Sequence, residues 1–321
     1  VAAFGLLNSF EPMTHDQFET IYKYDAVVVP KDSGSADNLS FLTDTLDKNS
    51  NVKYSMLVSQ QECTVTHGKK VKDSDTNLVV PRNPEKFDEI VSLHTRKGKE
   101  ELRLSDSGVM LSEKMCSELG IKTGDKITLN VDGKKAEVKV SGIFEQYIYN
   151  FVYMTPTAYK SLFGKDCTYN MADVALKDTS DSACDKFGSQ VLSDDKIAAV
   201  SYIASSLNEF RNMLNSLDMV VTVMIICAAA LAFVVLYNLT NINIAERVRE
   251  IATFKVLGFY NRETSSFIYK ENIILTILGI IVGLFLGNLL TGFIIQTVEV
   301  DNVMFGRDIY FTSYLYAAGL T

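Results

Sequence analysis

Two long stretches without a charged residue constrain this chain more than any other feature. They cover residues 219–245 and 272–298, 27 residues each. About 20 apolar residues suffice to cross the hydrocarbon core of a bilayer, and the buried helix of a soluble protein rarely stays apolar on every side for so long. The sequence therefore predicts two transmembrane helices, over residues 219–240 and 272–298.

Positive charges flank these stretches unevenly. The segment between them, residues 241–271, holds five Lys or Arg residues, whereas Arg211 alone precedes the first stretch within 20 residues and Arg307 alone occurs in residues 298–310. Short loops rich in Lys and Arg stay on the cytoplasmic side of a membrane. We therefore expect a multi-pass protein of the cell membrane, with residues 241–271 in the cytoplasm and with residues 11–204 and a short loop, 299–310, outside.

Both ends of the sequence carry short apolar segments. Residues 1–10 lack charge but are too few to span a bilayer, and no positively charged segment precedes them as it would in a signal peptide. We interpret them as the end of a preceding transmembrane helix, and residues 311–321 as the start of a further one. The natural protein is thus predicted to have at least four spans, two of them complete here.

The region before the first span is charged and mixed in its patterns. Residues 11–218 contain 32 Asp or Glu against 25 Lys or Arg without a basic stripe, which argues against a nucleic-acid partner. Apolar alternation predicts strands and helical spacing predicts helices. The predicted strands are 24–29, 52–58, 62–66, 77–80, 109–111, 124–131, 135–140, 172–176 and 197–202, and the predicted helices are 38–48, 113–119 and 181–192. The expected fold class is an α+β extracytoplasmic domain, with a strand-rich insertion across residues 60–150, joined to transmembrane α-helices.

Two local signals in the insertion are specific. Ser112 stands where a helix N-cap is expected, and Gly120 stands where that helix would end in a left-handed residue. Asp132-Gly133 lies between two alternating segments, which is typical of a two-residue β-hairpin turn.

A row of apolar residues at alternating spacings of three and four precedes the first span. Its members are Leu207, Phe210, Leu214, Leu217 and Val221. This is the spacing of a coiled-coil seam, and neither Pro nor Gly interrupts residues 205–237. We expect a stalk helix over residues 205–218 that continues into the membrane. Its seam would pair with a second copy of the subunit or, as readily, pack on its own domain.

Three glycines recur every four residues in the second span: Gly279, Gly283 and Gly287. A face of small residues allows another helix to approach closely, so the pattern favours a helix-packing face. The alternative is that glycine is simply common in membrane helices.

The sequence lacks the motifs of the common catalytic and metal sites. No G-x-x-x-x-G-K-[ST] segment occurs, so ATP would bind a separate polypeptide or a part of the protein beyond this sequence. The three histidines are scattered, without HExxH or G-x-S-x-G. We expect no enzyme activity, catalytic residue, metal or cofactor in this chain. Cys63, Cys116, Cys167 and Cys184 could pair outside the cell or remain free thiols.

The segment after the first span carries a family signature. Residues 241–258 read NINIAERVREIATFKVLG, which resembles the E-R-x-R-E-I and K-x-L-G segments of the FtsX-like permease family, the MacB type of ABC transporter subunit. The matching residues are Glu246, Arg247, Arg249, Glu250, Ile251, Lys255, Leu257 and Gly258. The outer segments VMLS and VSGIF are similar to the extracytoplasmic core domain of that family, and the segment YKYD resembles versions from Gram-positive bacteria.

The resemblance implies both partners and a function. The matching residues would form a coupling helix that docks on an ABC ATPase subunit; otherwise they only pack on their own spans. A second permease half, identical, different or fused in one chain, would complete the transporter in the membrane lipid. ATP hydrolysis by the partner would move the extracytoplasmic domain by mechanotransmission, which exports or releases a peptide, lipopeptide or lipid-linked cargo.

Two other functions fit the same architecture. An ABC-type complex could regulate a cell-wall hydrolase or a sensor kinase, with an envelope protein as a further partner, rather than transport a cargo. A substrate-binding receptor without transport is the third reading.

Overall fold

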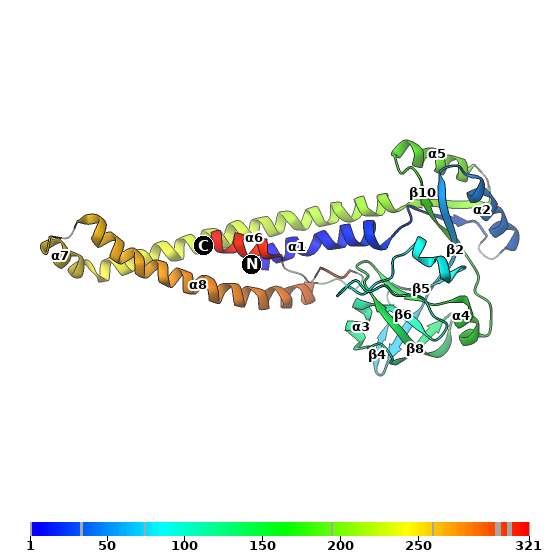
Figure 1. The fold of residues 1–321 in the computed structure, drawn as a ribbon, viewed down its shortest axis with the longest axis horizontal. Helices are drawn as coiled ribbons and strands as arrows, with labels where there is room; N and C mark the ends of the chain where they lie inside the picture. Colours follow the sequence, from blue (N-terminus) through cyan, green and yellow to red (C-terminus); the bar gives the residue numbers. More distant parts are fainter. Residues whose placement is uncertain are drawn as a thin grey trace. The chain divides into compact units, whose positions relative to one another are not determined.

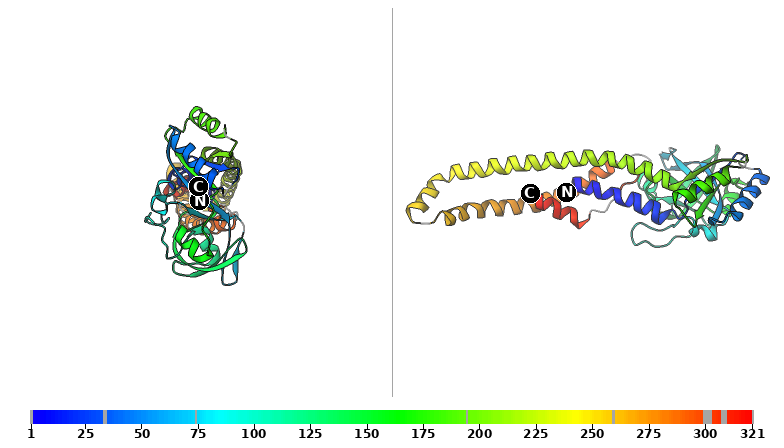
Figure 2. Two further views of the ribbon diagram at one scale, coloured as in Figure 1. Left: turned by 90° about the vertical axis from the view of Figure 1, so that its right-hand side faces the viewer. Right: turned by 90° about the horizontal axis from the view of Figure 1, so that it is seen from above.

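The chain folds into two compact units in the computed structural model, which describes residues 2–32, 35–73, 75–193, 195–258, 260–298, 303–306 and 310–320. The helical unit comprises Val1–Glu11, Asn212–Glu299 and Gly306–Thr321. The sheet unit comprises Pro12–Arg211 and Val300–Phe305. Figures 1 and 2 show long helices in the first unit and a mixture of strands and short helices in the second.

The sheet unit is built on an 11-stranded sheet in the order β11-β1-β10-β2-β5-β9-β6-β8-β7-β3-β4. The strands are β1 (Ala26–Pro30), β2 (Val52–Glu62), β3 (Thr64–His67), β4 (Lys70–Lys72), β5 (Thr76–Pro81), β6 (Val109–Ser112), β7 (Lys126–Val131), β8 (Lys134–Phe144), β9 (Asn150–Tyr153), β10 (Met171–Leu176) and β11 (Ile197–Tyr202). Neighbouring strands are antiparallel except for β5 with β9 and β6 with β8. The intervening helices are the π-helical η1 (Asp16–Ile21), α2 (Ala36–Lys48), the 3-10 helix η2 (Pro84–Glu89), α3 (Glu113–Leu119), α4 (Pro156–Phe163) and α5 (Asp181–Leu192). The unit is thus α+β, as predicted.

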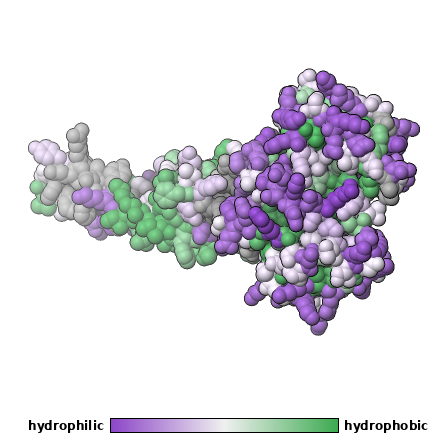
Figure 3. All heavy atoms as spheres, turned by 45° about the vertical axis from the view of Figure 1, so that its right-hand side comes forward, coloured by the Kyte–Doolittle hydropathy of each residue, from purple (hydrophilic) through white to green (hydrophobic). Residues whose placement is uncertain are grey.

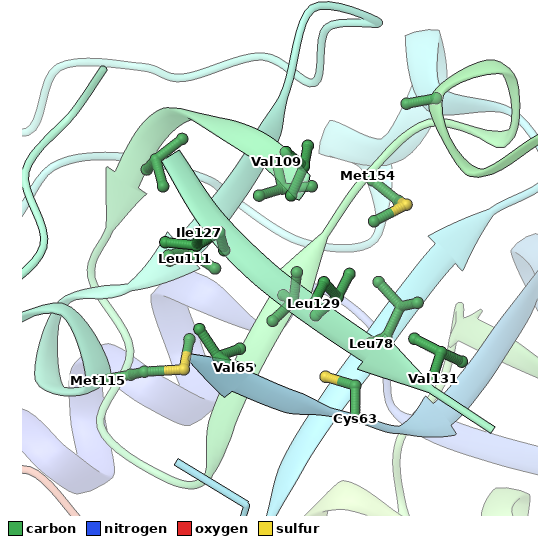
Figure 4. Packing of buried hydrophobic residues seen from close by; sticks show 14 of the residues in the cluster. Cys63, Val65, Leu78, Val109, Leu111, Met115, Ile127, Leu129, Val131 and Met154 are labelled. Carbon is green, nitrogen blue, oxygen red and sulfur yellow. The ribbon is translucent and has the colours of Figure 1, made fainter. Parts of the chain in front are cut away.

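Two hydrophobic clusters among the described residues help to stabilise the sheet unit. In the first, α2 and α5 cover β1, β2 and β10, with Leu42, Leu46 and Phe187 among the buried side chains. The second lies mostly within the predicted insertion, where residues of β3, β7, β8 and α3 pack together and α4, which follows the insertion, adds to them (Figure 4). Its most deeply buried members include Val65, Leu111, Met115, Ile127 and Leu129.

The strongest local signals of the sequence are confirmed. The predicted helix 38–48 is α2, and Leu42 and Leu46 are buried as their spacing required. Asp132 and Gly133 join β7 to β8 with φ of 51° and 77°, the left-handed conformation of a type I′ turn. Gly120 ends α3 at φ 72°. Ser112 precedes α3, but its hydroxyl makes no capping hydrogen bond.

The helical unit contains α6 (Ile203–Glu246), α7 (Val248–Val256), α8 (Asn261–Val298) and α9 (Phe311–Leu320), together with most of α1 (Ala2–His15). Two segments are long and apolar enough to cross a membrane, Met219–Glu246 and Ile273–Ile295, with mean hydropathy of 3.0 and 2.6. These values belong to the most apolar 18-residue window of each segment, in which 6% and 0% of the residues are buried, unlike the core helix of a soluble protein. Figure 3 shows the hydrophobic side chains gathered over this unit.

The segment predicted as a cytoplasmic coupling loop or helix, residues 241–271, is mostly helical. Helix α6 continues through residues 241–246, which contain neither Pro nor Gly, so nothing ends the helix at the predicted boundary. Helix α7 follows almost at once, and α8 begins at Asn261, before the predicted span at residue 272. The first span is therefore part of a helix of 44 residues.

Candidate coupling segment and the polar junction of the sheet unit

The residues predicted to couple to an ATPase lie where α6 turns into α8. The chain bends at Arg247, whose backbone N donates to the Ile244 carbonyl at 3.2 Å. Helix α7 then runs to Val256, and Gly258 follows it with φ of +88°. Only glycine adopts that conformation without strain, so a glycine is required where α7 gives way to the turn.

This coupling segment, residues 246–258, exposes apolar and charged side chains together. Val248, Val256 and Leu257 are 57%, 88% and 68% exposed. Glu246, Arg249 and Glu250 are also exposed, whereas Arg247 and Ile251 are half-buried; the side chains of Phe254 and Lys255 lie outside the described residues. A short helix with exposed apolar residues between charges of both signs is suited to docking in a groove of another protein.

The stalk seam is partly covered by its own chain. Leu214 and Val221 are buried, with 5% and 6% exposed, and Leu207 and Phe210 are half-buried. The ring of Phe210 lies 6.4 Å from that of Phe18. The side chain of Leu217 lies outside the described residues. These contacts favour packing within one chain for the buried members, and pairing with a second copy stays a prediction.

The small residues of the second span line a cavity of about 260 Å³ within the helical unit. Gly279 and Gly283 face it together with three alanines of α6, Ala228, Ala229 and Ala232. No atom lies within 4 Å of where a Cβ would stand on either glycine. Gly287 instead accepts a hydrogen bond at its carbonyl from the Thr291 hydroxyl, 2.7 Å. In this single chain, the first two glycines therefore border open space rather than a tightly packed helix.

A buried carboxylate organises a polar junction in the sheet unit. Glu145 is completely buried, with its Oε2 2.9 Å from His94 Nε2 and 2.7 Å from Lys99 Nζ. The Tyr147 hydroxyl donates to Oε1 at 2.5 Å. The backbone N of Tyr147 in turn donates to Gln17 Oε1 at 2.8 Å, which ties the junction to η1. Every oxygen of this carboxylate thus has a partner.

The partners of Glu145 decide its ionisation. Burial alone would raise the pKa of this carboxyl, but the contacts with His94, Lys99 and Tyr147 outweigh burial and lower the pKa to about 2. Burial and the hydrogen bond to Glu145 together raise the pKa of Tyr147. The junction therefore holds an ionised Glu145 and a neutral Tyr147 at physiological pH.

Residues that follow the second span return to this junction. Val303 forms an antiparallel bridge with Ile148, and the backbone N of Met304 donates to the Tyr147 carbonyl at 2.7 Å. The buried ammonium of Lys114 donates to the Val303 carbonyl at 2.6 Å. The sheet unit therefore includes a segment that is remote in sequence and lies beyond both predicted spans.

Two sequence-family models cover most of the chain. The model described as MacB-like periplasmic core domain matches residues 1–184, and the model described as FtsX-like permease C-terminal matches residues 222–320. The chain belongs to the FtsX-like, MacB-type family of ABC transporter permeases. Members of this family are membrane subunits with an extracellular domain, and they work with ABC ATPases.

Two solved structures similar to this permease are extracytoplasmic domains. The periplasmic region of MacB from Actinobacillus actinomycetemcomitans is 13% identical and covers 62% of this chain and 98% of that one, with a TM-score of 0.38. The extracellular domain of the noncanonic ABC-type transporter YknZ from Gram-positive bacteria is 14% identical, with 56% and 98% covered and a TM-score of 0.34. No curated protein matches the sequence. Membership of the family therefore rests on the two sequence models.

Sequence reasoning did not identify the polar junction of this permease. Glu145 and Tyr147 follow strand β8, and His94 and Lys99 lie in a segment without a regular pattern. Their spacing along the chain, about 50 residues, indicates no motif. The neighbouring basic residues Arg96, Lys97 and Lys99 were the available signal, and a group of this kind is indistinguishable in sequence from an exposed turn.

The cysteines and the polar clusters indicate no metal centre among the described residues. All five cysteines are free thiols, and Cys63 and Cys116 are buried in the insertion core. Burial raises the pKa of both thiols to about 12, so they remain protonated and unreactive. Among the described residues, no group of three His, Cys, Asp or Glu side chains stands close enough to hold a metal ion.

Proposed function

We propose that this permease subunit transmits the nucleotide-driven movement of a separate ABC ATPase to its extracytoplasmic domain. That movement exports or releases a peptide, lipopeptide or lipid-linked cargo at the outer face of the cell membrane, by mechanotransmission. A second permease half completes the complex in the lipid bilayer. Membership of the family establishes a membrane subunit that works with an ABC ATPase. The class of cargo and the mechanism are proposed here.

The observation that carries the proposal is the continuity of α6. Its 44 residues start directly after β11 of the extracytoplasmic domain and end at Glu246 of the coupling segment. At about 1.5 Å per residue, such a helix is about 66 Å long. Neither Pro nor Gly interrupts it, so a force on the coupling segment has an unbroken hydrogen-bonded path toward the extracytoplasmic domain.

The placement of residues 303–306 supports the proposed topology. Their contacts with Ile148, Tyr147 and Lys114 lie within the extracytoplasmic domain. The chain beyond the second span therefore belongs on the same side of the membrane as that domain, and the coupling segment between the two spans belongs on the other.

A charge reversal in the coupling segment tests the proposal. The full chain is purified from its native membrane in detergent together with its bound ATPase, which is identified by mass spectrometry. Glu250→Lys is expected to abolish the stimulation of ATP hydrolysis by the permease, because it reverses an exposed charge in the docking helix. Glu137→Lys, an equally exposed reversal on β8, is the control and should leave stimulation intact.

Two results would contradict the coupling role. One is the absence of any ATPase in the purified wild-type complex. The other is normal stimulation by the Glu250→Lys protein at a normal level of folded complex. Recovery of a hydrolase or a sensor kinase in the same complex would favour the regulatory alternative, in which the same movement controls an envelope enzyme or receptor.

A further inference from the structure

The face of the extracytoplasmic sheet that lies away from α2 and α5 carries buried apolar side chains, Met56 and Tyr153 among them, and the buried acid Asp173. Side chains alternate along a strand, and directly paired residues share a face. Ala172 and Val174 of β10 point into the core beneath α2 and α5, so Asp173 between them points to the opposite face. Asp173 pairs with Val27 on β1 and with Met56 on β2, which places it in the interior of the sheet rather than at an edge.

A pocket of about 230 Å³ opens on that face, and Asp173 lies in its wall. Four aromatic rings line it: Tyr24, Phe87, Phe151 and Tyr153. The remaining lining residues are Val27, Gln60, Val79, Val91, Met171 and Ser201. We call this site the Asp173 pocket. Its volume is below the roughly 300–1,000 Å³ of pockets for drug-sized ligands, so it suits one head group or one side chain.

The rings form a packed wall rather than a loose rim. Tyr153 lies 5.1 Å from Phe87 and 5.8 Å from Phe151 between ring centroids, and it is stacked on the second of these. Phe87 and Tyr153 are nearly fully buried, whereas Tyr24 is half-buried and Ser201 is exposed. The pocket is therefore rigid at its base and accessible to solvent near Ser201.

Asp173 differs from the other buried acid of this domain. Its residue is only 7% exposed, and its carboxylate has no hydrogen bond or ion pair within the described part of the chain. Glu145, by contrast, has three partners. An ionised buried carboxylate without a partner is destabilising, so its place at the base of an open aromatic pocket favours a bound cation as its partner.

The chemistry of the wall selects the kind of ligand. The described residues place no second carboxylate, histidine or cysteine near Asp173 that would complete a metal site. The faces of aromatic rings attract organic cations, most strongly when water is excluded. We propose that the Asp173 pocket binds an organic ammonium group, with Asp173 as its counter-ion and the rings of Tyr24, Phe87, Phe151 and Tyr153 as its wall.

Two sources could supply such a group. A primary ammonium occurs on peptides and on some lipid head groups, whereas a quaternary ammonium occurs on other lipid head groups. The proposal does not depend on coupling to an ATPase, because the pocket lies wholly within the extracytoplasmic domain.

Calorimetric titration of the full chain in maltoside detergent tests the proposal. The probes are butylammonium, tetramethylammonium and the neutral butanol, in phosphate buffer at pH 8 because Tris is itself an amine. Saturable binding of either cation, with no binding of butanol, is expected. Which cation binds more tightly distinguishes the primary from the quaternary source. Binding of neither cation, or equal binding of butanol, would overturn the proposal.

Matched variants locate the binding. Asp173→Asn keeps the shape of the side chain and removes a destabilising buried charge, so it should fold and yet bind at least tenfold more weakly. Tyr24→Leu should weaken binding by about 3- to 10-fold through the lost cation–π contact. Asp132→Asn, in the exposed β7–β8 turn, should change nothing. Wild-type affinity in the Asp173→Asn protein would exclude this pocket as the site.

Proton linkage gives an independent readout. Burial raises the pKa of Asp173 to about 7, and binding of a cation requires the ionised form. The affinity at pH 5.5 should therefore be about 30-fold weaker than at pH 8. The other titratable groups in the wall, Tyr24 and Tyr153, have pKa values raised by burial and stay neutral throughout. An affinity independent of pH would contradict the role of Asp173.

Discussion

Asp173 and Glu145 are buried acids of the same domain, and burial raises the pKa of a carboxyl in both places. Three contacts reverse that effect at Glu145, whose pKa falls to about 2, and no contact does so at Asp173, whose pKa rises to about 7. Opposite shifts give opposite dependences of stability on pH. The two residues therefore report separately on the polar junction and on the Asp173 pocket.

Asp173→Asn is expected to stabilise the protein at alkaline pH. The folded-state pKa of about 7 exceeds the ordinary 3.8, so the folded state retains a proton that the unfolded state has lost between those values. The free energy of unfolding of the wild type thus falls as pH rises from 4 to 7, by on the order of 4 kcal/mol. Asn is uncharged and escapes this loss. In thermal unfolding at pH 5 and pH 8, the unfolding temperature of the variant should exceed that of the wild type by more at pH 8. A variant less stable than the wild type at pH 8 would refute the raised pKa of Asp173.

Glu145→Gln should show the reverse dependence. The lowered pKa of Glu145 stabilises the folded state above pH 4.5, and this contribution disappears as pH falls toward 2. At pH 7 the free energy of unfolding of the variant should therefore be lower than that of the wild type by on the order of 3 kcal/mol, and its unfolding temperature should be lower as well. Both differences should be smaller at pH 3.5. Glu137→Gln, which removes an exposed acid 3.9 Å from Lys126, is the control and should have little effect. A Glu145→Gln protein as stable as the wild type at pH 7 would show that the junction contributes nothing.

Among the elements, those with a local signal could be predicted from the sequence. Helix α2 had its apolar spacing, the β7–β8 hairpin had Asp132-Gly133, and β11 was predicted with its observed limits. Strand β9 was not predicted, because its four residues, NFVY, are all buried and show no alternation. Helix α4 is eight residues long, too short for a clear helical period.

The Asp173 pocket could not be predicted for a different reason. Its lining comes from β1, β2, β5, β9, β10 and β11 and from the segment around η2. Only the strand order and register bring these elements together, and neither is encoded in local spacing. The coupling segment was found without the structure because its residues are contiguous in the chain.

A proline within α6 should separate the two ends of this helix functionally. Asn215→Pro removes a backbone donor at an exposed position of α6 and costs about 3 kcal/mol in a helix interior. We expect ATPase stimulation to persist while nucleotide-dependent movement of the extracytoplasmic domain is lost. The measurement is the distance between spin labels at Lys134→Cys in two copies, with and without nucleotide. Asn215→Ala should behave as the wild type, and undiminished movement in the proline variant would contradict transmission through α6.

For the molecule as a whole, the proposed topology places α7 and the β7–β8 turn on opposite sides of the membrane. A membrane-impermeant maleimide applied to intact cells should label Lys134→Cys and not Val256→Cys, which is 88% exposed and should react only after permeabilisation. Both variants are made with Cys167, Cys184 and Cys227 replaced by serine. Labelling of Val256→Cys from outside would reverse the orientation and remove the basis for coupling.

The return of residues 303–306 limits how this permease can be rebuilt. Val303, Met304 and Phe305 are buried in the extracytoplasmic domain, although they lie some 90 residues beyond its main segment. In a chimera that received only residues 12–211 from a relative, these three apolar side chains would pack against a foreign surface, and the Val303 carbonyl would lose its donor Lys114. The domain can therefore be exchanged only when residues 12–211 and 303–305 are replaced together. Natural substitutions in one segment have to be matched by substitutions in the other.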